Sequence, residues 1–252
     1  MNVEAIKDLL YRLGDDDLIL GHRQSEWTGI GPILEEDIAF SSMAQDEIGH
    51  AQAYYVILNE LFGEPTPDQI GFGRKSEAFR CSQLVEYPIG DYAFSLMRHA
   101  LYDLAESVRL EELTRSSFRP LAELAKKLLR EERYHYLHAT TWLKQLGRAT
   151  DEANANLQVA LDFAYPIAFS LFEPTALDAA IFADGIQAPE SELEARWVEG
   201  VEALMKECGF VLPKVADKTV HYGGRQGKHT PHLEKLLAEM DEVFAIDTNA
   251  VW

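Results

Sequence analysis

The chain has 252 residues, of which 47% are hydrophobic, and its formal net charge is −19. This length and apolar content are enough for a substantial buried core. The 42 acidic side chains outnumber the 23 basic ones, which argues against a surface that follows phosphate groups or an anionic membrane. We therefore expect neither a nucleic-acid-binding protein nor a membrane-surface protein.

The beginning of the chain, Met-Asn-Val-Glu-Ala-Ile-Lys-Asp, carries charges where a secretion signal needs an apolar stretch. No later segment approaches the roughly 20 apolar residues of a membrane span. The two cysteines, Cys81 and Cys208, belong to no zinc-type pattern, and a lone pair does not predict a disulfide. These features predict a soluble, cytoplasmic protein.

Two long helices are predicted in the first quarter of the chain. Apolar residues recur at helical spacing over residues 3–27, and residues 33–62 lack proline and contain one glycine, Gly49. Glycines and a proline at residues 29–32 separate the two segments, and Gly63 begins the break that ends the second. The pattern is typical of a helix hairpin.

A second hairpin is predicted after a long connection. Residues 63–89 are rich in glycine and proline, which predicts a crossover with short helical turns. Helices are then expected at about 91–115 and 119–146, with Pro120 in a first turn and Gly147 at an end. A long link between two helix hairpins is the connection found in ferritin-like bundles.

The remaining chain also predicts helices. Helical periodicity runs over residues 153–183, with interruptions at Pro166 and Pro174. Two further helices are expected at residues 191–207 and 231–246, the last with Thr230 as N-cap and Pro231 in its first turn.

The predicted fold is therefore all-α: a ferritin-like four-helix bundle with a long crossover and additional C-terminal helices. We expect a single domain over residues 1–252, in which the bundle covers about 3–146 and a helical extension about 150–252.

The pattern Glu-x-x-His occurs twice, at Glu47 to His50 and at Glu132 to His135. Asp17 lies 30 residues before Glu47, and Asp103 lies 29 residues before Glu132, each on the preceding predicted helix. Residues i and i+3 share one face of a helix, so each pair directs a carboxylate and an imidazole to a common point. A duplicated hairpin of this kind is the ligand pattern of di-iron and di-manganese carboxylate bundles. The candidate metal ligands are Asp17, Glu47, His50, Asp103, Glu132 and His135.

The candidate ligands lie on apolar helix faces, which predicts that they are buried. The face of the first Glu-x-x-His pair continues through Phe40, Met43, Tyr54, Leu58 and Leu61, and that of the second through Leu121, Leu124, Leu128, Ala139, Trp142 and Leu146. Burial of an isolated carboxylate costs several kcal/mol. Two divalent cations would neutralise four carboxylates, and the donor set suits iron, or manganese as an alternative. A core of protonated or hydrogen-bonded acids is the alternative interpretation.

Neighbouring residues compete for ligand roles. Glu106 lies one turn past Asp103 on the same face and is the alternative ligand on that helix. Asp15 and Asp16 are expected to be solvated. His138 is interpreted as a residue beside the ligands or on the surface rather than as a ligand.

Several motifs link the chain to a known family. They are Arg12-Leu-Gly-Asp15, Leu18-Ile-Leu20, Glu26-Trp27, Pro32, Glu36-Asp37-Ile-Ala39, Glu132-Arg-Tyr-His135, Gly223-Gly-Arg-Gln-Gly-Lys-His-Thr230, His232-Leu233 and Leu237-Ala-Glu-Met240. Over nearly its whole length the chain resembles the ferritin-like subunits of the multicomponent phenylacetyl-CoA epoxidase. The motifs after residue 222 resemble the structural, PaaC-type subunit in particular.

The resemblance implies a role in phenylacetate catabolism, as a component of a multicomponent monooxygenase. In this family the di-iron centre belongs to a catalytic subunit, the structural subunit pairs with it, and the complex inserts one oxygen atom into the ring of phenylacetyl-CoA. A separate reductase delivers electrons from NADPH. The expected partners are therefore the catalytic subunit and, indirectly, the reductase, in a homo- or hetero-oligomer.

The chain departs from the structural subunits, which have lost part of the ligand set. Its segment from Gln45 to His50 resembles the catalytic subunit, and all six candidate ligands are present. Three hypotheses follow: a structural subunit with its own dinuclear site, an interaction subunit without metal, or a self-sufficient di-iron oxidase on another substrate. Whether this chain is active alone is left open.

The basic loop at residues 222–229 has two interpretations. It is expected to be solvated, with Arg225 and Lys228 meeting an acidic partner or a CoA phosphate as the alternative.

Overall fold

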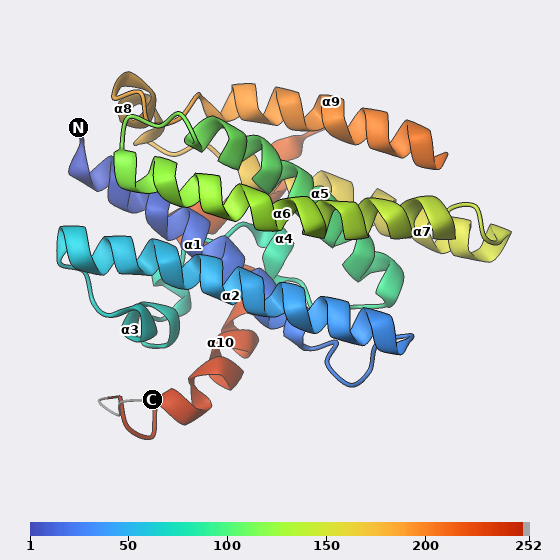
Figure 1. Cartoon of the computed structure of the whole chain (residues 1–252), viewed down its shortest axis with the longest axis horizontal. Helices are drawn as coiled ribbons and strands as arrows, with labels where there is room; N and C mark the ends of the chain where they lie inside the picture. Colours follow the sequence, from blue (N-terminus) through green and yellow to red (C-terminus); the bar gives the residue numbers. More distant parts are fainter. Residues whose placement is uncertain (249–252) are drawn as a thin grey trace. The chain divides into compact units, whose positions relative to one another are not determined.

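The computed structural model describes residues 1–248, and every regular element within that range is a helix (Figure 1). This confirms the all-α fold class. The helices form two compact units, which we call the terminal unit (Val3–Pro88 and Gly223–Trp252, described to residue 248) and the central unit (Met1–Asn2 and Ile89–Tyr222). The assignment of residues 1–252 to one ferritin-like domain stays a prediction from the sequence.

The terminal unit is built on an antiparallel hairpin of α1 (Val3–Ser25) and α2 (Leu34–Phe62), which run side by side (Figure 1). Glycine permits their close approach, because a Cβ atom on Gly14 would lie 2.6 Å from Cε1 of Tyr55. Helix α2 ends at Gly63, whose φ of 70° is the left-handed conformation that favours glycine at a helix end. The predicted first hairpin is confirmed.

Short helices and the end of the chain complete the terminal unit. The crossover contains α3 (Pro67–Phe72), η1 (Ser76–Ala78) and α4 (Gln83–Glu86), as the glycine- and proline-rich sequence predicted. After η4 (Gly224–Gln226) comes α10 (Pro231–Phe244). The side chain of Thr230 accepts a hydrogen bond from the backbone N–H of His232, which confirms the predicted N-cap.

The central unit contains the second hairpin, formed by α5 (Tyr92–Leu113) and α6 (Arg119–Leu146). It continues through α7 (Asp151–Ala168), η2 (Phe169–Phe172), α8 (Asp178–Ala183), α9 (Glu190–Cys208) and η3 (Lys218–His221). Trp197 of α9 is fully buried, and its Nε1 donates a hydrogen bond of 2.9 Å to the carbonyl oxygen of Leu101 in α5. Helices α5 and α9 therefore share a core.

Two details of the helix prediction were wrong. Pro166 does not interrupt α7, which contains it and ends at Ala168. The lost N–H and the ring of proline act on a single turn close to the helix end, and the chain continues directly as a 3₁₀ helix. Leu61, expected in the core, is 53% exposed because it lies in the last turn of α2. None of the helices within residues 1–248 has the length and apolar character needed to span a membrane.

Candidate metal centre

The first ligand group lies in the terminal unit and consists of Asp17, Glu47 and His50. Asp17 comes from α1, and the other two come from α2, where their spacing of three residues puts them on one face. The three residues are at most 2% exposed, which confirms the predicted burial. One ligand atom from each lies within 4.8 Å of the others. The sequence therefore brings two carboxylates and one imidazole to a common point.

Glycine positions α1 against this group. Gly21 lies one turn after Asp17, and a Cβ atom on it would be 3.1 Å from Cβ of Glu47. A larger residue at this position would push α1 away from α2, so Gly21 keeps the carboxylate of Asp17 within reach of the ligands on α2.

The second ligand group lies in the central unit and consists of Asp103 from α5 with Glu132 and His135 from α6. These residues are also at most 2% exposed. Nδ1 of His135 lies 3.2 Å from Oε1 of Glu132. Burial and the negative charge of Glu132 raise the pKa of Asp103 well above its usual value. A cation bound here would oppose both effects.

Histidines surround Asp103 more closely than the sequence interpretation foresaw. Nδ1 of His99, one turn earlier on α5, lies 3.0 Å from Oδ1 of Asp103, and His99 is 1% exposed. Its ring centroid is 5.6 Å from that of the half-buried His138. The helical spacing from His99 to Asp103 was the signal that identified this residue. Glu106 is buried as well, so the choice between it and Asp103 as the ligand on α5 stays a prediction.

The donor atoms of both groups fit iron or manganese. Carboxylate oxygens and imidazole nitrogens are the ligands these ions take in helical carboxylate proteins. Burial of several carboxylates is unfavourable unless protons or cations compensate their charge. The assignment of all six residues to one dinuclear centre stays a prediction from the duplicated pattern.

The expectation that Asp15 and Asp16 are solvated was wrong. Both are buried, at 0% and 5% exposure. Asp15 accepts hydrogen bonds of 2.6 Å from the hydroxyl of Tyr55 and from the backbone N–H of Arg80, and it forms an ion pair with Arg74. The crossover covers this side of α1 and supplies the donors and positive charge that make burial of the carboxylates tolerable.

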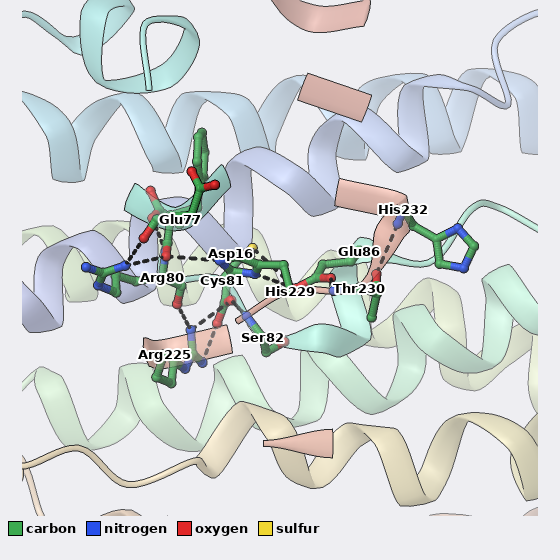
Figure 2. Close-up of polar contacts among 12 residues, drawn as sticks. Asp16, Glu77, Arg80, Cys81, Ser82, Glu86, Arg225, His229, Thr230 and His232 are labelled. Atoms are coloured by element: carbon green, nitrogen blue, oxygen red, sulfur yellow. Dashed lines mark hydrogen bonds and ion pairs between the residues drawn. The ribbon is translucent and has the colours of Figure 1, made fainter. Parts of the chain in front are cut away.

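The expectation of a solvated basic loop was also wrong for Arg225, which is 5% exposed. Its guanidinium donates two hydrogen bonds to the carboxylate of Asp16, at 2.9 and 2.6 Å (Figure 2). The loop approaches the crossover so closely that a Cβ atom on Gly224 would lie 2.1 Å from the carbonyl oxygen of Cys81. The acidic partner of Arg225 is therefore in the chain itself.

Comparison with known proteins supports the resemblance seen in the sequence. The family model described as phenylacetic acid catabolic protein matches residues 1–252. The chain is 32% identical over 241 residues to the PaaC-type subunit of 1,2-phenylacetyl-CoA epoxidase from Escherichia coli strain K12. The aligned region covers 96% of this chain and 96% of that protein.

Proposed function

Because the chain belongs to the phenylacetic acid catabolic protein family, we propose that it is the PaaC-type subunit of a 1,2-phenylacetyl-CoA epoxidase, a multicomponent oxygenase of phenylacetate catabolism. The observation that carries this proposal is the 32% identity to the Escherichia coli protein, which extends over 96% of both chains. An alignment over nearly the full length includes the C-terminal segment, where the PaaC-type motifs lie.

The proposed partner is the catalytic subunit of the same complex, in a hetero-oligomer in the cytoplasm. A separate reductase supplies electrons from NADPH. In this arrangement the ring-oxygenation chemistry belongs to the catalytic subunit, and the present chain contributes to assembly and to any metal chemistry of its own.

Co-purification tests the function directly. The full chain is co-expressed with a catalytic subunit, and NADPH-dependent oxygenation of phenylacetyl-CoA is measured with the reductase present. We expect a stable complex and turnover that requires the present chain. Absence of a complex together with unchanged turnover would refute the proposed role.

We further propose that the two ligand groups hold iron, with manganese as the alternative, in a dinuclear centre. Asp17, Glu47 and His50 would supply one set of donors, and Asp103, Glu132 and His135 the other. The carboxylates would balance the charge of the ions, and their burial would exclude bulk water from the donors. His99 beside Asp103 would hold that carboxylate in place. Bound iron of this kind supplies dioxygen activation.

A second candidate function is an interaction subunit without metal. The raised pKa of Asp103 favours it, because a protonated carboxyl group needs no cation when buried. Elemental analysis of protein purified without chelator separates the two candidates. Iron or manganese bound to the chain supports the metal centre, whereas protein free of both supports the interaction subunit. Oxygen uptake by this chain alone with a reductant would instead support a self-sufficient oxidase.

A further inference from the structure

Three metal-binding residue types meet in the terminal unit, away from both ligand groups in the sequence. Cys81 and Glu86 belong to the crossover, and His229 follows η4 near the end of the chain (Figure 2). Nδ1 of His229 lies 2.7 Å from Oε1 of Glu86. The sulfur of Cys81 lies 4.0 Å from that oxygen and 3.9 Å from that nitrogen. We call these three residues the Cys-Glu-His cluster.

The cluster is closed to solvent. Cys81 and Glu86 are 0% exposed, and the side chain of His229 is 4% exposed. The second oxygen of Glu86, Oε2, accepts a hydrogen bond of 2.6 Å from the backbone N–H of Thr230. Backbone contacts on both sides therefore hold the donor atoms in place without help from water.

The hydrogen bonds of His229 indicate that a cation lies between its ring and Glu86. Nε2 is 3.2 Å from the carbonyl oxygen of Phe79, which can only accept, so Nε2 carries a proton. In a neutral ring Nδ1 is then an acceptor, and it would face a carboxylate oxygen that is also an acceptor. Two acceptors 2.7 Å apart require a positive species between them, either a proton or a metal ion.

We propose that the Cys-Glu-His cluster binds one divalent cation of the zinc type through Sγ of Cys81, Oε1 of Glu86 and Nδ1 of His229. Thiolate, imidazole and carboxylate are the ligands that zinc takes in proteins, and a fourth tetrahedral position remains for water. The Nε2 contact with a backbone carbonyl is the arrangement that orients metal-binding histidines. The thiolate distinguishes this cluster from the two groups of oxygen and nitrogen donors, which suit iron or manganese.

The charges balance in both states of the cluster. Without metal, burial and the charge of Glu86 raise the pKa of the Cys81 thiol, which stays protonated. The ring of His229 is then an imidazolium paired with the Glu86 carboxylate. Binding of a divalent cation releases the thiol proton and the Nδ1 proton, so the ion faces one thiolate and one carboxylate. The buried cluster is neutral before and after binding, which avoids the cost of an uncompensated charge.

A metal ion in this cluster would link two distant parts of the chain. Cys81 and His229 are separated by 148 positions. The adjacent Arg225 to Asp16 contact already holds the same loop against α1. The ion would therefore stabilise the docked form of the C-terminal segment, independently of any oxygenase activity.

The test uses the full chain after treatment with a chelator, titrated with cobalt(II) as a spectroscopic probe and with zinc. We expect the near-ultraviolet charge-transfer band of thiolate-bound cobalt, its displacement by zinc, and a higher Tm with zinc. Cys81→Ser should remove the band and weaken zinc binding by at least about tenfold. Cys208→Ser, which changes the other buried thiol, should leave both unchanged.

Absence of a thiolate band in the unmodified protein would show that the cluster is a proton-held ion pair only. A band that persists in Cys81→Ser would equally overturn the proposal. The result on the unmodified protein stands even when the variant does not fold. A variant with both His50 and His135 replaced by alanine should keep the band, so failure of the proposed iron centre and failure of this site give different results.

Discussion

The guanidinium of Arg225 and the carboxylate of Asp16 form a two-point contact between residues separated by 209 positions. Asp16 also accepts a hydrogen bond of 2.6 Å from the backbone N–H of Ser82. Asp16 directly precedes the candidate ligand Asp17 on α1. The C-terminal loop and the crossover therefore both hold the turn of α1 that presents a ligand of the first group.

Replacement of Arg225 by methionine should destabilise the protein by about 3–5 kcal/mol, because it leaves the charge of Asp16 buried without its cationic partner. The free energy of unfolding is measured by chemical denaturation. Lys228→Ala removes a half-buried charge from the same loop and serves as the control, with an expected change below about 1 kcal/mol. Equal effects of the two substitutions would contradict the assigned role of Arg225.

Two glycine substitutions should have opposite effects. Gly224→Ala places a methyl group 2.1 Å from the carbonyl oxygen of Cys81, which must displace the loop and cost at least about 1–3 kcal/mol. Gly49→Ala adds a methyl group in α2 where nothing lies within 4 Å, and it should stabilise the protein by about 0.5–1 kcal/mol. Thermal unfolding of both variants provides the comparison, and a shift of Tm in the same direction would argue against close docking of the loop.

The two ligand-group histidines should determine the metal content. Replacement of both His50 and His135 by alanine removes one nitrogen donor from each group, so bound iron or manganese should fall at least about tenfold. Elemental analysis of natively purified protein gives the measurement. His221→Ala, a histidine of η3 outside both groups, should retain the metal. Metal content that is unchanged in the double variant would exclude these residues as ligands.

Glu64 should make stability depend on pH in the acid range. Hydrogen bonds from Lys7 and Tyr11 to this carboxylate lower the pKa of Glu64 below its usual value of 4.5. The folded protein therefore binds fewer protons there than the unfolded chain, and the stabilisation is present above the usual pKa and disappears as the pH falls through the lowered one. Solvent screening limits it to about 1 kcal/mol.

The variant Glu64→Gln should accordingly unfold more easily than the unmodified protein at neutral pH, and the difference should vanish in acid. Denaturation curves at several pH values measure it. Glu60→Gln, an exposed glutamate at the end of α2, is the matched control. A difference between Glu64→Gln and the unmodified protein that stays constant with pH would exclude the proposed ionic contribution.

The sequence by itself determined the helices and the local part of the candidate metal centre. Helical periodicity and glycine or proline breaks are contiguous signals, so the hairpins were predicted within a few residues. Glu47 and His50, and likewise Glu132 and His135, were recognised because a spacing of three residues defines one helix face. Their apolar neighbours on that face predicted burial, which the structure confirms.

Only the tertiary structure decided the surroundings of Asp15, Asp16, Arg225 and His229. Charged residues beside one another in a sequence predict a solvated surface, unless a distant segment supplies the opposite charge and excludes water. Here the crossover and the C-terminal loop provide both, through partners that are 59 to 209 positions away. No local pattern encodes such a pairing, because it arises when separate segments pack together and bury charges that are tolerated only in pairs.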